Sequence, residues 1–111
     1  MQTTIRVATQ DDVATLFAIR TSVVQNHLSV AQMADLGITP QVLAESIRDA
    51  SCAWIAEVDG QPAAFAMVDL AECEVFAMFV LPTHERLGLG RKLMAVAEAV
   101  LFEHHTTLFL I

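Results

Sequence analysis

The sequence predicts a single mixed α/β domain, in which helices cover a β-sheet. Apolar runs rich in strand-forming residues alternate with stretches whose apolar residues recur at the period of a helix. The 111 residues fit one domain, which buries enough surface to fold without disulfides or metals. Hydrophobic residues make up 55% of the chain and charged residues 17%, which excludes a disordered chain. We therefore expect one domain over residues 1–111, in the order strand, helices, hairpin, strand, helix and strand.

The first strand is predicted at residues 3–8, and a helix follows it. Thr9 precedes Asp12 by three residues, which is the spacing of a capping box at a helix start. Apolar residues then recur at roughly the 3.6-residue period. We expect this helix to end near Asn26.

Two shorter helices come next. Ser29 and Gln32 form a second capping box, and Gly37 closes the helix that it opens. Thr39 precedes a helix over residues 40–49, whose first residue is a proline. Proline suits that position because its ring already holds a helical φ angle.

A β-hairpin is predicted in the middle of the chain. Asp59 and Gly60 separate two runs rich in strand formers, residues 52–58 and 63–70, and this dipeptide favours a type I′ turn. Pro62 lies near the start of the returning strand, where the loss of one ladder hydrogen bond is tolerable.

The last part of the chain predicts a strand, a helix and a strand. Residues 74–81 are apolar and aromatic and end at Pro82, which is typical of a buried central strand. Residues 89–103 carry an apolar helical stripe, and residues 107–111 form a short apolar run. This order predicts two parallel strands joined by a right-handed crossover.

Charge and composition exclude several classes of partner. Thirteen acidic residues against six Lys and Arg give a net charge of −7, which disfavours binding to nucleic acid or to a membrane surface. No apolar run is long enough to span a membrane, and the start lacks the layout of a signal peptide. Cys52 and Cys73 lack the spacing of metal ligands, so we expect buried thiols and no metal site. The cytoplasm is the expected compartment.

The basic residues are concentrated in one segment. Arg86, Arg91 and Lys92 fall within seven consecutive residues, and Gly88 and Gly90 lie among them at a predicted helix start. The first amides of a helix have no internal partner and the dipole is positive there, so such a start binds phosphate. The alternative is that the glycines only shape the loop and the cations are solvated. The acidic remainder of the chain favours a cationic second substrate.

This segment resembles the acyl-coenzyme A motif of the GNAT superfamily of N-acyltransferases. The third glycine of a Rossmann fingerprint and the Lys-Ser/Thr pair of a P-loop are both missing. The order of the predicted elements is also that of the superfamily. The positions that match the motif are Val80, Pro82, Gly88, Leu89, Gly90 and Leu93.

Two positions depart from the motif. Glu85 stands where Gln or Arg is usual, and Arg86 stands where Gly is frequent. A carboxylate beside a pyrophosphate is repulsive. Either Glu85 points away and Arg86 supplies the contact, or affinity for the coenzyme is weakened.

The resemblance implies that acetyl-coenzyme A is the co-substrate and that an amine attacks it directly. Amides of residues 87–92 would hold the pyrophosphate, and the backbone of Phe79 and Val80 would pair with the pantetheine arm between two splayed parallel strands. Met78 and Phe79 either flank the acyl group or are simply core residues. The expected cofactor-binding residues are Phe79, Val80, Arg86, Leu87, Gly88, Leu89, Gly90, Arg91 and Lys92.

Glu74 is the candidate catalytic base. It lies eleven residues before Glu85, which is where histone acetyltransferases of the superfamily carry their base. Apolar neighbours would raise its pKa toward neutrality. The alternative is a solvated carboxylate at the start of a strand. Many members use a Tyr as the acid, but this chain has none, and His84 is a possible substitute.

The resemblance also implies a C-terminally truncated member that ends inside the strand after the motif helix. An apolar strand there, at residues 108–111, would expose a sheet edge, so we expect a homodimer that covers it. The other interpretation is a fragment of a longer enzyme or the product of a truncated gene. Two functional alternatives stay open: a catalytically weak acyl-coenzyme A binding module, and a structural domain without a ligand.

Overall fold

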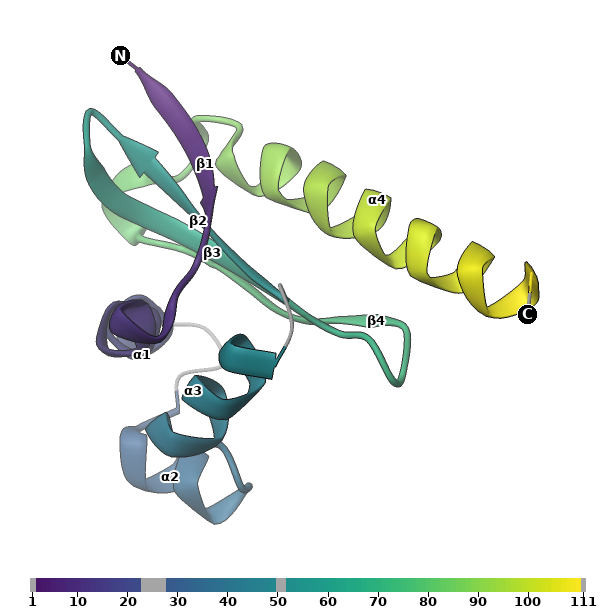
Figure 1. Cartoon of the computed structure of the whole chain (residues 1–111). Helices are drawn as coiled ribbons and strands as arrows, with labels where there is room; N and C mark the ends of the chain where they lie inside the picture. Colours follow the sequence, from purple (N-terminus) through teal and green to yellow (C-terminus); the bar gives the residue numbers. More distant parts are fainter. Residues whose placement is uncertain (1, 23–27, 50–51, 111) are drawn as a thin grey trace.

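A four-stranded antiparallel sheet forms the centre of the molecule (Figure 1), with the strand order β1-β2-β3-β4. The computed structural model describes residues 2–22, 28–49 and 52–110, with side chains up to residue 103. The mixed α/β class expected from the sequence is confirmed. The strands are β1 (Thr3–Val7), β2 (Ala53–Val58), β3 (Gln61–Asp69) and β4 (Glu74–Val80).

Helices cover both faces of this sheet (Figure 1). On one face α1 contacts β3 and β4, and α3 packs against α1. On the other face α4 crosses β2, β3 and β4. Short 3₁₀ helices, η1 and η2, precede α1 and α4. The helices are η1 (Gln10–Asp12), α1 (Val13–Ser22), α2 (Val30–Asp35), α3 (Pro40–Asp49), η2 (Pro82–His84) and α4 (Leu89–Leu110).

Both predicted capping boxes are present. The Gln32 amide donates to Ser29 Oγ at 3.1 Å, and the Ser29 amide donates to Gln32 Oε1 at 2.9 Å. The Thr9 amide donates to Asp12 Oδ2 at 2.8 Å. These bonds satisfy amides that the helix itself leaves without acceptors. The end expected near Asn26 lies outside the described residues.

The predicted hairpin is confirmed in its turn and in its strands. Asp59 and Gly60 have φ angles of 51° and 83°, and a type I′ turn requires positive φ at both positions. Pro62 lies opposite Glu57, where the register of the β2–β3 pair shifts. The missing proline amide therefore falls at an irregularity and not within the regular ladder.

The core lies between the sheet and the helices on its two faces. Ile55 of β2 is fully buried, and Leu93 and Ala97 of α4 are fully buried against the sheet. Leu16 of α1 is 1% exposed and packs in the same cluster. Because β2 and β3 are covered on both faces, most of their residues are buried.

The structure corrects the prediction for residues 107–111. Residues 107–110 form no strand, because α4 continues to Leu110. After Gly90 the sequence contains neither Gly nor Pro, so no residue favours a helix stop. The expected parallel pair is therefore absent, and all strand pairs in the described part of the chain are antiparallel.

The expectation of a buried central strand at residues 74–81 was also wrong. β4 is the edge strand of the sheet as described, and its residues are half-buried or exposed. Its apolar character reflects helices above and below it, since Phe79 contacts the α1 side and Met78 the α4 side. The side chains of a strand point to the two faces of the sheet, so an apolar strand indicates that both faces are covered. Apolar side chains do not show whether a second strand pairs along each edge.

The two cysteines differ from each other. Cys52 is buried as expected, and desolvation raises the pKa of its thiol. Cys73 is exposed in the turn between β3 and β4, which corrects the expectation that it is buried. Its φ of 53° is that of a turn residue, so Cys73 belongs to the reversal of the chain and not to the buried part of a strand.

Candidate functional site

The loop from β4 to α4, residues 81–88, is called the motif loop below. It begins with η2, in which the His84 amide donates to the Leu81 carbonyl at 2.8 Å. Two residues then adopt positive φ, Arg86 at 69° and Gly88 at 79°. Glycine enters this region without strain, so Gly88 suits the turn that leads the chain into α4.

The start of α4 leaves a run of backbone amides without protein acceptors. The first amide with a backbone partner is that of Lys92, which donates to the Gly88 carbonyl at 3.2 Å, so the expected run of available amides ends at residue 91 and not at residue 92. Within the described part of the chain, the amides of residues 87–91 donate to no protein group. These amides lie at the positive end of a 22-residue helix. The arrangement is able to hold an anion.

The three clustered cations surround these amides. Arg86, Arg91 and Lys92 are all exposed, and none forms an ion pair with another described residue. Glu85 is also exposed, and its side chain has no protein partner among them. At Gly90 a Cβ atom would come within 3.7 Å of Met78 Cε, which is ordinary contact with a flexible side chain. A substituent at position 90 therefore fits the fold.

β4 leads directly into the motif loop, with its amides and cations. Phe79 pairs with Phe65 of β3, and Val80 pairs with Ala64. The other edge of β4 has no strand neighbour in the described residues, so its backbone groups there have no ladder partner. The structure thus brings together every predicted cofactor-binding residue, at one end of an open strand edge.

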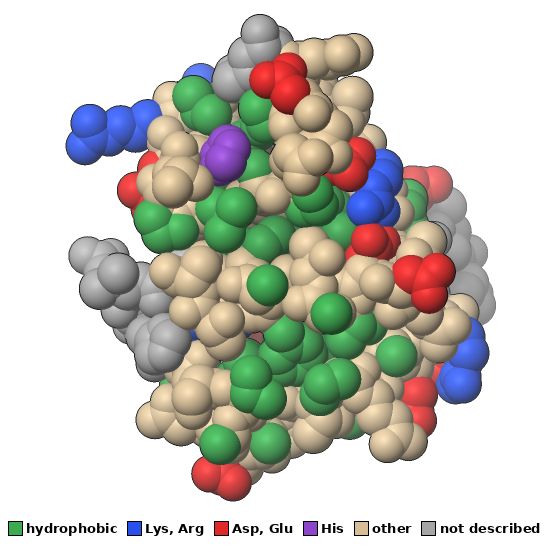
Figure 2. Space-filling model, turned by 90° about the vertical axis from the view of Figure 1, so that its left-hand side faces the viewer, with side chains coloured by type: hydrophobic (Ala, Val, Ile, Leu, Met, Phe, Trp, Pro, Cys, Tyr) green, Lys and Arg blue, Asp and Glu red, His purple; other side chains and the backbone are tan. Residues whose placement is uncertain are grey.

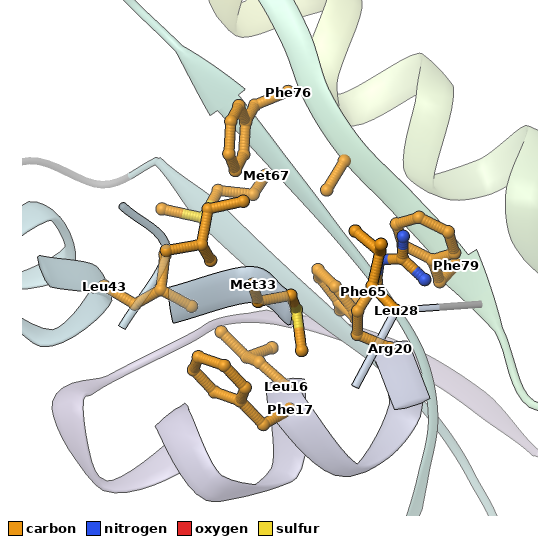
Figure 3. Close-up of a pocket in the computed structure, with 12 residues that line it drawn as sticks. Leu16, Phe17, Arg20, Leu28, Met33, Leu43, Phe65, Met67, Phe76 and Phe79 are labelled. Atoms are coloured by element: carbon orange, nitrogen blue, oxygen red, sulfur yellow. The ribbon is translucent and has the colours of Figure 1, made fainter. Parts of the chain in front are cut away.

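A cavity of about 180 Å³ lies on the opposite face of β4 from α4 (Figure 3). α1 contributes Leu16 and Phe17, and β4 contributes Phe79. Met78, on the alternate face of the strand, does not line it and contacts the start of α4 instead. Of the expected pair flanking the acyl group, only Phe79 therefore faces this cavity.

Arg20 brings a charge into the apolar cavity. It is the only polar side chain among the described residues that line it. Its guanidinium carbon lies 4.2 Å from the centre of the Phe79 ring, a cation–π contact that orients the side chain (Figure 3). Sequence reasoning missed Arg20. The available signal was an arginine four residues after Leu16, within the apolar stripe of α1.

A β-bulge shapes the far end of the cavity. The register of β3 with β4 shifts between Met67 and Val68, because Phe76 is an extra residue between Val75 and Ala77. A bulge re-aims the side chain of the inserted residue. Phe76 lines this cavity and also a neighbouring hollow of about 390 Å³ beside α2 and α3, and 45% of its surface stays exposed.

Glu74 lies away from the other predicted residues. It is the first residue of β4, is exposed, and pairs with Asp69 across the strands. Five residues separate it from Phe79, about 17 Å along the strand at the usual rise per residue. The structure does not bring Glu74 together with the motif loop. His84 lies within that loop, and its Nδ1 is 2.9 Å from Thr83 Oγ1.

Apolar side chains also gather on the surface near this cavity. Figure 2 shows hydrophobic groups collected in the lower half of the face, at the height of α1, α2 and α3, with charged groups mostly toward its margins. Leu36 is 66% exposed and Val30 52% exposed. Among the described residues, no helix is both long and apolar enough to cross a membrane.

Comparison with known proteins places this geometry in a family. The chain matches the acetyltransferase (GNAT) family model over residues 12–111. No curated protein sequence matches it significantly. A PaiA N-acetyltransferase from Thermoplasma acidophilum, solved with coenzyme A, superimposes with a TM-score of 0.69 at 13% identity over 93% of this chain and 74% of that one.

Two further solved structures have the same fold. A GCN5-related N-acetyltransferase from Ralstonia eutropha gives a TM-score of 0.70 at 21% identity, over 94% of this chain and 78% of its own. The ribosomal-protein-S18-alanine N-acetyltransferase of Escherichia coli gives 0.65 at 21% identity, over 90% and 59%. At these identities the likeness concerns the fold, and the family match covers nearly the whole sequence. The chain therefore belongs to the GNAT acetyltransferase family.

Proposed function

We propose that this protein transfers an acetyl group from acetyl-coenzyme A to an amine, by direct attack of the amine on the thioester. The observation that carries the proposal is a run of amides at residues 87–91 beside three cations and the edge of β4, all of them without a partner among the described residues. Family membership supports it, as does a relative of the same fold that was solved with coenzyme A.

Each predicted residue has a role in this proposal. The amides of residues 87–91 bind the pyrophosphate, and Arg86, Arg91 and Lys92 neutralise its charge. The free edge of β4 at Phe79 and Val80 pairs with the amides of the pantetheine arm, as an added strand would. The thioester then lies beside Phe79.

Binding and transfer are tested together by calorimetry with acetyl-coenzyme A and by release of free thiol with a panel of amines. Gly90→Glu places a carboxylate among the anion-binding amides, so we expect it to abolish coenzyme binding. The fold survives because a Cβ at this position only touches Met78. Ala95→Glu, which adds the same charge at an exposed position of α4, is the control and retains binding. If Gly90→Glu bound acetyl-coenzyme A as tightly as the parent, the coenzyme site would not lie at this loop.

Glu74 is proposed as the base that removes the proton of the acceptor ammonium. General bases contribute about 10²- to 10⁴-fold to rate. We therefore expect Glu74→Gln to lower kcat at least ~100-fold without changing coenzyme affinity. Asp69→Asn, the cross-strand neighbour, is the control. Equal kcat in Glu74→Gln and the parent would exclude this role.

The second candidate function is an acyl-coenzyme A binding module that does not catalyse transfer. Glu74 is far from Phe79, and the chain contains no Tyr to serve as the acid; both observations favour this candidate. Coenzyme binding without thiol release for any amine would establish it.

We also propose that the protein is cytoplasmic and forms a homodimer. Phe102 of α4 is 74% exposed, so this apolar side chain is the proposed contact with the second copy, and the edge of β4 stays open to the coenzyme. Sedimentation as a 12.1 kDa species at micromolar concentration would contradict the dimer.

A further inference from the structure

The cavity between α1 and β4 has one charged end and one apolar end. Arg20 and Phe79 lie together at one end, and Phe76, Met67 and Leu43 lie toward the other (Figure 3). Nothing polar lines it besides Arg20, in the described part of the chain. A ligand that fits both ends carries an anion and an apolar group.

The volume limits the size of the apolar group. An apolar cavity of about 150 Å³ is large enough to bind benzene. The present cavity of about 180 Å³ therefore accepts one ring or one branched aliphatic side chain, and not a long acyl chain. Its walls include the rings of Phe17, Phe65 and Phe79, which suit such a group.

The charge limits the other end of the ligand. A simple alkyl ammonium would meet the guanidinium of Arg20, a like charge in surroundings of low polarity. A carboxylate would instead make a charge-assisted, bidentate pair with that guanidinium. The contact with Phe79 already restricts the Arg20 side chain, so less conformational entropy is lost on binding.

Phe79 links this cavity to the proposed coenzyme site. Its ring lines the cavity, and its backbone belongs to the open edge of β4. A carboxylate at Arg20 and an amine at the edge of β4 are consequently close together, with the apolar group pointing away from both. In an α-amino acid, a single carbon carries these three groups.

We propose that the acceptor is a free α-amino acid with a neutral, apolar side chain the size of leucine, methionine or phenylalanine. This rests on the proposed acetyltransferase function. Arg20 binds the carboxylate, and the cavity receives the side chain.

The reaction balances as an ordinary acyl transfer. The α-ammonium first loses one proton, and its nitrogen lone pair then forms a C–N bond to the thioester carbonyl carbon. The C–S bond breaks, and the coenzyme leaves as a thiolate that takes up a proton. The nitrogen loses a second proton, so the products are an N-acetyl amino acid, free coenzyme A thiol and one net proton.

The test compares ligands that differ by one group. L-Phenylalanine, L-phenylalaninamide and phenethylamine share the ring, but only the first has a carboxylate; L-aspartate has the carboxylates without the apolar group. Binding is measured by calorimetry without coenzyme, and thiol release is measured with acetyl-coenzyme A. We expect phenylalanine to bind at least ~10-fold more tightly than the other three, because hydrogen bonds to charged groups are the strong ones.

The variant Arg20→Gln isolates the carboxylate contact. We expect it to weaken phenylalanine binding ~10- to 100-fold and to leave phenethylamine binding unchanged or improved. Arg48→Gln is the matched control, because Arg48 is exposed on α3, pairs with Asp49 and is not among the described residues that line the cavity. Circular dichroism and coenzyme affinity establish that Arg20→Gln is folded.

The outcomes separate this inference from the proposed function. Equal binding of phenylalanine and its amide, or equal losses for both in Arg20→Gln, would overturn the assignment of the acceptor. Thiol release only with amines that lack a carboxylate would also overturn it, while leaving the acetyltransferase intact. Carboxylate-dependent binding without thiol release would support the pocket and refute catalysis.

Discussion

Arg86 is the residue at which the chain departs from its family motif and also from ordinary backbone geometry. Its φ of 69° lies in the left-handed region, which costs a side-chain-bearing residue about 1–2 kcal/mol. Glycine is frequent at this position in the motif that the sequence resembles, and it would adopt the same angle without strain. The arginine therefore adds a positive charge to the motif loop at a cost in stability.

We expect Arg86→Gly to leave the free energy of unfolding equal or up to about 1 kcal/mol higher, because relief of strain exceeds the added entropy of the unfolded chain. Acetyl-coenzyme A binding should weaken, since one cation is lost. Arg91→Gly is the contrast: Arg91 lies in the first turn of α4 without positive φ, so the same change should destabilise. Urea unfolding of the three proteins measures this difference. A loss of stability in Arg86→Gly as large as in Arg91→Gly would show that the backbone at Arg86 is not strained.

For single residues, the sequence allowed correct predictions where a local structure, such as a turn or a helix cap, accepts few residue types. Gly88, Ser29 and Asp59 are examples, because a tight turn or a cap favours few residue types. Sequence reasoning failed for Arg20 and for the Phe76 bulge. A lone arginine in an apolar stripe, or one extra residue in a strand, acquires meaning only from what packs across from it.

At the scale of elements, Asp12 joins the first strand to the first helix. Its carboxylate accepts from Arg6 Nη1 at 2.8 Å and Nη2 at 2.9 Å, and also from the Thr9 amide. Arg6 Nε lies 3.4 Å from Glu57 of β2, so β1, β2 and the start of α1 share one network. The Arg6 hydrogen bonds are the main cause that lowers the pKa of Asp12 to about 2.

We expect Asp12→Ala to lower the free energy of unfolding at pH 7 by about 1–2 kcal/mol, through the lost charged hydrogen bonds and cap. Because the folded pKa lies below the unfolded value of 3.8, this stabilisation is present above pH 3.8 and is lost as the pH falls toward 2. The free energies of unfolding of the parent and of Asp12→Ala should therefore become equal as the pH approaches 2.

Thermal unfolding at several pH values measures that convergence. Asp49→Ala is the control, since the Arg48–Asp49 pair is exposed and should contribute nothing measurable. A pH-independent difference between Asp12→Ala and the parent would mean that the charge of Asp12 plays no part.

The same scale shows where periodicity is ambiguous. The hairpin of β2 and β3 could be predicted because its turn has a distinctive dipeptide. The end of α4 could not, because an apolar run of a few residues suits a strand and a buried helix equally. For β4, pattern gave the strand but not its place in the sheet, since strand order depends on contacts distant in sequence.

At the scale of the whole molecule, the proposed coenzyme site is a positive spot on an acidic protein. The chain has a net charge of −7, while Arg86, Arg91 and Lys92 lie together at one end of the sheet. Coenzyme A is itself a polyanion, so the acidic remainder of the protein repels it and the cluster of three cations attracts it. Salt screens both effects, with a Debye length of about 10 Å at 0.1 M.

We expect affinity for acetyl-coenzyme A to fall as salt rises from about 0.02 to 0.2 M, because contact with the cations dominates. In Arg91→Gln/Lys92→Gln the slope should flatten or reverse, since mainly the repulsion by the acidic remainder is left. Arg48→Gln/Arg6→Gln removes as much charge elsewhere and should keep the slope of the parent. An unchanged slope in the first double variant would show that these cations do not face the coenzyme.

Successive side chains of β4 point to opposite faces of the sheet, so adjacent residues contact different surroundings. Met78 on one face contacts α4, whose start is the proposed anion site, and Phe79 on the other face lines the proposed acceptor cavity. Under the proposed function, Met78 therefore belongs to the coenzyme side of the strand and Phe79 to the acceptor side. In the proposed arrangement, exchanging α1, α2 and α3 for those of a relative would change the acceptor and leave the coenzyme-binding loop untouched.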